Sequence, residues 1–192
     1  ENYKNEYVVI APDEGALKRG RCYADIFGLN VVAVSKERSD VKLNHVENVR
    51  LIGDPKMIEN KTAIIVDDMC DTFGTVQNVS KLLISYGAKD VIVAVTHGIL
   101  SDPAIERINS TPEIKMVIVS DSIPQNRKLK VCKKLHVFSI AKLLSEVVVR
   151  ISNNQSVSEI FKMERVGSGL FNSGIWSDSA PNTPKGKFMV DL

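Results

Sequence analysis

The sequence predicts an α/β fold, a parallel sheet with helices on both faces. Short apolar runs rich in Val and Ile alternate along the chain with stretches of helical periodicity. The apolar runs are continuous, which is typical of strands buried on both faces of a parallel sheet. Ligands of such sheets bind at the edge formed by the carboxyl ends of the strands.

The first part of the chain contains one expected helix. Its pattern covers residues 17–27 and ends at Gly28, a normal stop for a helix. A polar, charged loop is expected from residue 36 to about residue 48. Apolar and β-branched runs indicate strands at residues 7–11, 30–34, 49–53 and 62–66.

The second part of the chain continues the alternation. A helix is expected over residues 75–86, with Gly87 as its stop. Two further helical stretches cover residues 103–109 and 141–151. The remaining strands are expected at residues 91–96, 116–119 and 135–140.

Composition narrows the class of protein. The chain has 192 residues, a formal net charge of +2 and 44% hydrophobic residues, which suffices for one packed domain of ordinary size. The balanced charge gives no sign of a nucleic-acid or membrane surface, and no apolar run reaches membrane-spanning length. The cysteines Cys22, Cys70 and Cys132 are scattered, without metal-like spacing. They favour a reducing, cytoplasmic location without structural disulfides.

The composition changes near residue 162. Gly, Ser, Asn and Pro dominate from there through residue 183, and no periodicity survives. We therefore expect a domain over residues 1–161 and a loop-rich or disordered tail over residues 162–192.

Residues 64–75 carry the strongest functional signal. Three β-branched residues lead into the adjacent acids Asp67 and Asp68, and the turn Asp71-Thr72-Phe73-Gly74-Thr75 opens the next helix. A helix N-terminus presents unpaired N–H groups and a positive dipole end, so it binds phosphate. The spacing fits a sugar phosphate, with its hydroxyls on the acids and its phosphate on the loop. The alternative is an acidic strand end before an ordinary capped helix.

The same run resembles the phosphoribosyl-pyrophosphate binding motif of type I phosphoribosyltransferase folds. Its form, DDMxDTxGT, is similar to that of the ribose-phosphate pyrophosphokinase (PRPP synthetase) family. Residues 11–19 resemble the family's pyrophosphate loop, and residues 35–38 its catalytic Lys-x-Arg. Further segments that resemble the family, in the family's order, are residues 96–101, 122–125 and 156–161.

The resemblance implies transfer of a diphosphoryl group from ATP to ribose 5-phosphate, giving PRPP and AMP, with Mg²⁺ as cofactor. It implies catalytic roles for Lys36 and Arg38, whose side chains would share one side of an extended loop. It implies that Asp13 contacts magnesium; a helix N-cap is the alternative for this residue. The implied pyrophosphate loop comprises Asp13, Glu14, Gly15 and Ala16. The residues implied for ribose 5-phosphate are Arg38, Asp67, Asp68, Asp71, Thr72, Phe73, Gly74 and Thr75.

The sequence departs from the family in two respects. Family members contain two similar halves, and this chain resembles only the carboxyl half, so we expect it to be inactive alone. The family's pyrophosphate loop usually reads Asp-Ala-Gly-Gly, whereas this chain has Glu14 and Ala16. Glu14 adds negative charge beside an anion site, and Ala16 adds a methyl group where backbone approaches phosphate.

The resemblance also implies dimers that stack into hexamers. It places Ser156 and Ser158 at a regulatory site for phosphate or ADP at a subunit boundary; helix capping is the alternative. His97 is expected to be a buried, hydrogen-bonded structural residue. Lys18 and Arg19 lie in an expected helix, where solvation is the more common outcome than phosphate binding.

Three functional alternatives can be weighed against this resemblance. A non-catalytic PRPP-synthetase-associated regulatory subunit would keep the fold, but that class usually loses the Lys-x-Arg pair and the DTxGT loop, and this chain has both. A nucleobase phosphoribosyltransferase is a near neighbour, although residues 96–101 and 122–125 argue against it. A phosphoacceptor receiver domain would carry its acids after the first strand, without a Gly-Thr loop. The chain has no GxxxxGK[ST] loop, so ATP would not bind in that mode.

Overall fold

The computed structural model describes residues 3–37 and 48–161. The chain divides into two compact units, Glu1–Phe138 and Ser139–Leu192, and each is described separately. The predicted tail over residues 162–192 lies outside the described residues, and the predicted domain boundary at residue 161 stays a prediction.

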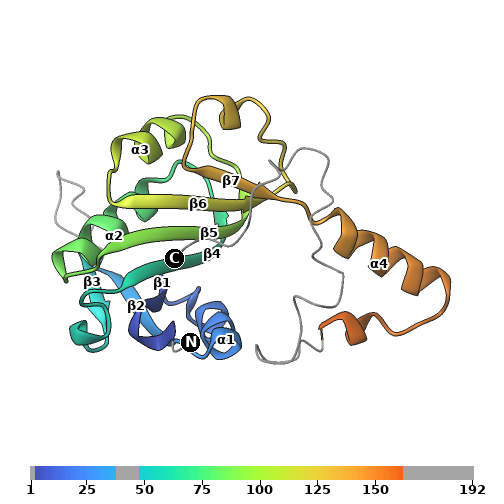
Figure 1. The fold of residues 1–192 in the computed structure, drawn as a ribbon, viewed down its shortest axis with the longest axis horizontal. Coiled ribbons are helices and arrows are strands. Elements are labelled where there is room, and N and C mark those ends of the chain that lie inside the picture. Colours follow the sequence, from blue (N-terminus) through green and yellow to red (C-terminus); the bar gives the residue numbers. More distant parts are fainter. Residues whose placement is uncertain (1–2, 38–47, 162–192) are drawn as a thin grey trace. The chain divides into compact units, whose positions relative to one another are not determined.

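The first unit is built on a seven-stranded sheet with the order β3-β2-β1-β4-β5-β6-β7, shown in Figure 1. Every neighbouring pair is parallel except β2 and β3. The predicted α/β class with a parallel sheet is therefore confirmed. The strands are β1 (Tyr7–Ala11), β2 (Asn30–Glu37), β3 (Asn48–Ile52), β4 (Thr62–Cys70), β5 (Asp90–Gly98), β6 (Ile114–Ser120) and β7 (Leu135–Phe138).

The antiparallel pairing of β2 and β3 has a simple cause. Only ten residues, 38–47, separate the two strands. A parallel neighbour needs a crossover of about a dozen residues or more, so the chain returns along the same edge in the opposite direction.

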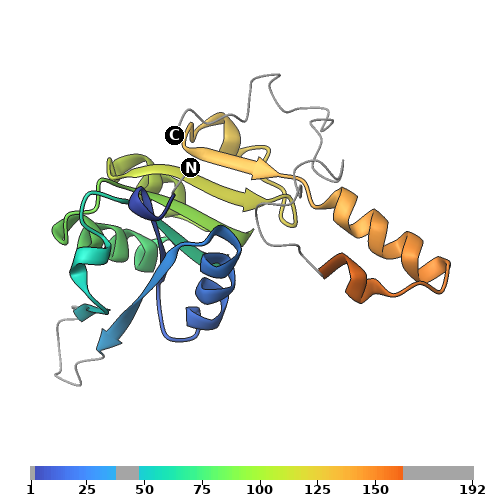
Figure 2. The same cartoon turned by 60° about the horizontal axis from the view of Figure 1, so that its bottom comes forward.

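Helices cover the sheet on both sides. Helix α1 (Leu17–Phe27) packs on β1, β2 and β4, while α2 (Gly74–Ser85) contacts β3, β4, β5 and α3 (Ala104–Ser110). Figures 1 and 2 show α1 on the face opposite to α2 and α3. Three short 3-10 helices complete this unit: η1 (Tyr3–Asn5), η2 (Pro55–Met57) and η3 (Lys128–Lys130).

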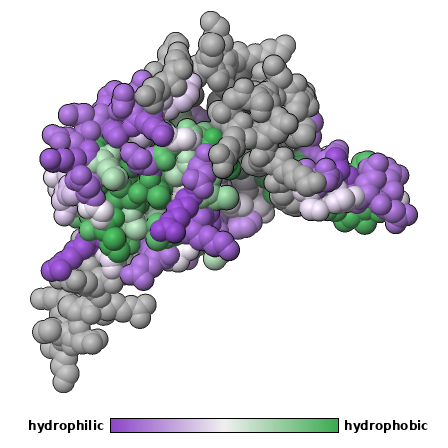
Figure 3. Space-filling view, turned by 90° about the horizontal axis from the view of Figure 1, so that it is seen from below, coloured by the Kyte–Doolittle hydropathy of each residue, from purple (hydrophilic) through white to green (hydrophobic). Residues whose placement is uncertain are grey.

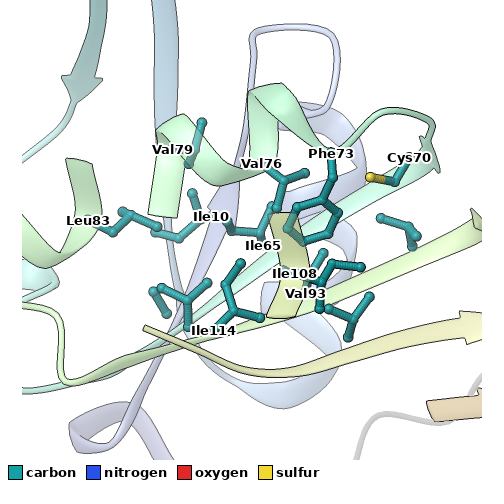
Figure 4. Packing of buried hydrophobic residues seen from close by; sticks show 14 of the residues in the cluster. Ile10, Ile65, Cys70, Phe73, Val76, Val79, Leu83, Val93, Ile108 and Ile114 are labelled. Carbon is teal, nitrogen blue, oxygen red and sulfur yellow. The ribbon is translucent and has the colours of Figure 1, made fainter. Parts of the chain in front are cut away.

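The burial pattern of the strands explains why helices lie on both faces. In β1, Val8 and Ile10 belong to the larger hydrophobic cluster with α2 and α3, whereas Val9 packs with the α1 side. Successive strand residues point to opposite faces, so a strand apolar at every position needs a helix on each side. The larger cluster is shown in Figure 4.

Several strands end later than predicted. The ladder between β4 and β5 continues to the pairs Met69 with His97 and Cys70 with Gly98, so Asp67 and Asp68 lie inside β4 rather than in the loop after it. Backbone pairing, not hydrophobicity, sets this length. Likewise β2 runs to Glu37, because it pairs with β3, and the predicted loop start at residue 36 was wrong.

The second unit contains α4 (Ala141–Ser152) and the 3-10 helix η4 (Val157–Phe161). Helix α4 has no buried residue. Figure 3 shows hydrophobic and hydrophilic side chains together on this helix, at the right of the view. Its large exposed hydrophobic side chains are Leu144, Val148, Val149 and Ile151. Within residues 3–37 and 48–161, no helix has the length and apolar character needed to cross a membrane.

Candidate functional site

The residues of the sugar-phosphate prediction gather where β4 ends and α2 begins. Asp67 is half-buried and Asp68 is exposed, both within β4. Asp71 and Thr72 are exposed in the turn that follows, and α2 starts at Gly74. The structure therefore brings the two acids and the start of the helix to one edge of the sheet, as the motif predicts.

Phe73 anchors this turn to the core. Its backbone is left-handed, with φ of 66°, and its side chain is 2% exposed. Figure 4 shows the ring among Ile65, Val76 and Ile108. The side chain is thus committed to the core, and only the backbone of Phe73 is available to a ligand. This conformation is uncommon for a non-glycine residue, so the buried ring is what holds it.

The start of α2 has the properties of an anion site. Phe73 occupies the N-cap position, and no side chain caps the helix there. The first backbone bond of the helix, from the Gln77 N–H to the Phe73 carbonyl, is 3.0 Å long. A helix N-terminus carries backbone N–H groups and a positive dipole end, which together favour a phosphate group.

Arg107 of α3 is hydrogen-bonded to the backbone of this turn. Its Nη1 donates to the Thr72 carbonyl at 2.7 Å. A Cβ added to Gly74 would come within 3.1 Å of the same Nη1. The glycine therefore leaves room for Arg107 beside the loop, a requirement that residues 64–75 alone do not reveal.

Arg19 joins the two acids. Its Nη1 lies 2.8 Å from Oδ1 of Asp67, and its Nη2 lies 2.9 Å from Oδ2 of Asp68. The prediction that Arg19 is mainly solvated was wrong, since its side chain is 30% exposed and bonded to both carboxylates. The nearer partner, Asp67, stands 48 residues away in the chain, so helical spacing could not reveal either acid.

The two acids have different electrostatic surroundings. Burial raises the pKa of Asp67, helped by the nearby carboxylates of Asp68 and Asp13 and opposed by the N–H of Asp68. Slight burial also works to raise the pKa of Asp68, but its interaction with the neighbouring Asp67 carboxyl group, the Arg19 charge and the Met69 N–H outweigh it. The pKa of Asp68 is therefore lowered.

The predicted pyrophosphate loop lies between β1 and α1. Oδ1 of Asp13 accepts a hydrogen bond from the Ala16 N–H at 2.9 Å. Asp13 thus stabilises the turn before α1, whereas the N-cap position itself is held by Ala16. Glu14 and Gly15 are exposed, and the Ala16 side chain is buried, so the methyl group of Ala16 points into the protein.

The predicted catalytic pair is only partly described. Lys36 lies in β2, where its backbone pairs with Val49 of β3, and not in an extended loop as predicted. Arg38 lies outside the described residues.

His97 lies near the end of β5. Its Nδ1 is 2.8 Å from Oγ of Ser122, which agrees with the predicted hydrogen bond. The residue is half-buried, however, rather than buried, because β5 carries it to the edge of the sheet.

In the second unit, Ser156 and Ser158 are exposed next to each other, with their hydroxyl oxygens 2.8 Å apart. The Ser156 carbonyl accepts a hydrogen bond from Nη1 of Arg150 at 3.1 Å.

Known proteins are similar to this chain in sequence and in fold. A family model described as the phosphoribosyl synthetase-associated domain matches residues 47–162. Ribose-phosphate pyrophosphokinase 3 of Saccharomyces cerevisiae is 40% identical over 161 residues, which cover 84% of this chain and 48% of that protein.

A solved structure agrees with these sequence matches. Phosphoribosylpyrophosphate synthetase from Mycobacterium smegmatis matches with a TM-score of 0.68 and 37% identity, over 80% of this chain and 47% of that one. The chain thus spans about half the length of these relatives. It belongs to the ribose-phosphate pyrophosphokinase (PRPP synthetase) family, through its phosphoribosyl synthetase-associated domain.

Proposed function

We propose that this chain supplies the ribose-phosphate and pyrophosphate sites of a ribose-phosphate diphosphokinase, which converts ATP and ribose 5-phosphate to PRPP and AMP. One observation carries the proposal: α2 starts at Gly74, one short turn after the two adjacent carboxylates near the carboxyl end of β4. The turn from Asp71 to Thr75 receives the 5-phosphate on its backbone N–H groups, and Asp67 and Asp68 face the ribose hydroxyls.

The chemistry needs alignment and positive charge more than covalent catalysis, because charge builds on the transferred phosphoryl oxygens. Lys36 and Arg38 supply that charge in our proposal, and Lys36 lies near the carboxyl end of β2. The loop from Asp13 to Ala16 receives the pyrophosphate.

Magnesium fits this arrangement. Mg²⁺ is usually held by one or two carboxylates, with water and substrate phosphates completing its shell. No group of three His, Cys, Asp or Glu able to hold a metal occurs in the part of the chain that the structure describes, which is compatible with such a shared site. Asp13 would contribute Oδ2, since its Oδ1 already accepts the Ala16 N–H. The ion would supply positive charge to the phosphates.

Regulation and assembly belong to the same proposal. Ser156 and Ser158 bind phosphate or the phosphate groups of ADP at a boundary between subunits of a dimer-based hexamer. Two adjacent exposed hydroxyls in the second unit support this assignment. Retention of Lys36 and of the turn from Asp71 to Thr75 favours the enzyme over a non-catalytic regulatory subunit.

Calorimetry with ribose 5-phosphate and with inorganic phosphate tests the sugar-phosphate site. Gly74→Val should weaken both ligands by about tenfold or more, because the side chain displaces Arg107 and the loop. Asp67→Asn should weaken only ribose 5-phosphate, since phosphate does not need the acids. Asp25→Asn, an exposed acid of α1, is the matched control. Equal affinities in all variants would refute the site.

A second test asks whether the chain is active alone. Incubated with ATP, ribose 5-phosphate and magnesium, it should release no AMP above the enzyme-free background, because the family's other half contributes to the ATP site. AMP is measured by chromatography, with a full-length family member as the positive control. AMP release by this chain would contradict the proposal that catalysis needs the family's other half.

A further inference from the structure

The acid pair of β4 is held by local and long-range bonds. Oδ1 of Asp67 accepts the Asp68 N–H at 2.9 Å, and Oδ1 of Asp68 accepts the Met69 N–H at 2.9 Å. Arg19 adds one bond to each carboxylate. The guanidinium therefore reaches two consecutive residues of one strand, whose side chains would point to opposite faces in a regular strand.

These bonds are distributed differently over the oxygens of the two acids. Both oxygens of Asp68 already have a donor, Met69 N–H on Oδ1 and Arg19 on Oδ2. Oδ1 of Asp67 has two donors, the Asp68 N–H and Arg19. Among the described residues, none donates to Oδ2 of Asp67. A carboxylate oxygen can accept about two hydrogen bonds, so Oδ2 of Asp67 is the most available acceptor of the pair.

The shared ion pair also lowers the negative charge beside the start of α2. Two uncompensated carboxylates beside the start of α2 would oppose the approach of a phosphate dianion. One guanidinium shared by both acids removes one of the two negative charges. The Asp68 side chain is 53% exposed, whereas that of Asp67 is 22% exposed.

We propose that Arg19 is a positioning residue for sugar recognition: it engages Asp68 in an internal ion pair and fixes Asp67, so that Oδ2 of Asp67 is the principal acceptor for a ribose hydroxyl. This inference rests on the proposed function and deepens it. Arginine suits the role because its planar fork reaches two carboxylates at once, whereas a lysine ammonium acts as a point charge.

Calorimetry on Arg19→Gln, Arg19→Lys and the control Arg21→Gln tests the inference. Arg21 lies on the same helix and is exposed. We expect Arg19→Gln to weaken ribose 5-phosphate by about tenfold while inorganic phosphate changes by less than about twofold. Arg19→Lys should recover only part of the loss, and Arg21→Gln should behave as the unsubstituted chain. Asp68→Asn should cost less ribose 5-phosphate affinity than Asp67→Asn.

Carboxyl-carbon NMR gives a readout that needs no ligand. In Arg19→Gln the pKa of Asp68 should rise, because the Arg19 charge helps to lower it. An unchanged pKa would show that the ion pair does not form, and would overturn the inference. Circular dichroism verifies that each variant is folded.

The binding outcomes separate this inference from the proposed function. Equal loss of phosphate and ribose 5-phosphate in Arg19→Gln would make Arg19 a phosphate ligand. Unchanged ribose 5-phosphate binding in Arg19→Gln would make Arg19 dispensable for sugar recognition. Tighter binding would mean that Arg19 competes with the sugar for the two acids. Either result overturns the inference while the sugar-phosphate site stands. If the unsubstituted chain binds neither ligand, the proposed function fails, and this inference with it.

Discussion

Replacement of Phe73 by alanine should lower the free energy of unfolding by about 3–5 kcal/mol. The ring is 2% exposed and belongs to the largest hydrophobic cluster, so its removal costs transfer energy and leaves a cavity. Figure 4 shows it enclosed by side chains from β4, α2 and α3. Urea denaturation at neutral pH measures the loss.

Two further variants sharpen this prediction. Phe27→Ala is the matched control, because that ring is 47% exposed at the end of α1, and we expect it to cost less than about 1 kcal/mol. Phe73→Leu should fall between wild type and Phe73→Ala, since it keeps most of the apolar volume. If Phe73→Ala costs no more than Phe27→Ala, the ring does not anchor the turn in solution.

The second large effect is on the pH dependence of stability. Burial raises the pKa of the Cys70 thiol to about 12, although the N–H of Phe73 opposes the shift. Well below pH 9 the thiol is protonated in both the folded and the unfolded chain, so its contribution is constant. Above that pH the unfolded chain loses the proton and the folded chain keeps it. Stability is therefore lost as pH rises, by about 1.4 kcal/mol per pH unit from this group.

Comparison of the unsubstituted chain with Cys70→Ala isolates this contribution. The substitution removes a buried thiol and lowers stability at every pH. The quantity to compare is therefore the slope of unfolding free energy against pH. Between pH 9 and pH 10.5 the unsubstituted chain should lose about 1.6 kcal/mol more than the variant. Groups that titrate in both proteins cancel in the difference. Parallel curves would contradict burial of Cys70.

The sequence predicts the helices and strands of this fold well because strands buried on both faces are continuous apolar runs. It misses the direction of β3, which depends on the short connection at residues 38–47. It also misses the ends of β4 and β5. Residues such as Asp67 and His97 are polar, and only the pairing of the two strands keeps them extended.

The candidate site is likewise predictable only in part. The turn from Asp71 to Thr75 is recognisable because its strand, loop and helix are adjacent in sequence. The roles of Arg19 and Arg107 are not recognisable, since each contacts the site from a distant element. Sequence periodicity reports which face of a helix is apolar, but not which acid or carbonyl group a charged side chain will meet.

Helix α1 touches both halves of the proposed site. Its N-cap residue, Ala16, donates its N–H to Asp13 of the proposed pyrophosphate loop, and Arg19, three residues later on the same side, bonds to the acids of β4. Because one short helix carries both contacts, a ligand that shifts α1 at one proposed subsite would also shift the contact at the other. In that case binding at the two subsites is thermodynamically linked, and each ligand alters the affinity of the other by the same factor.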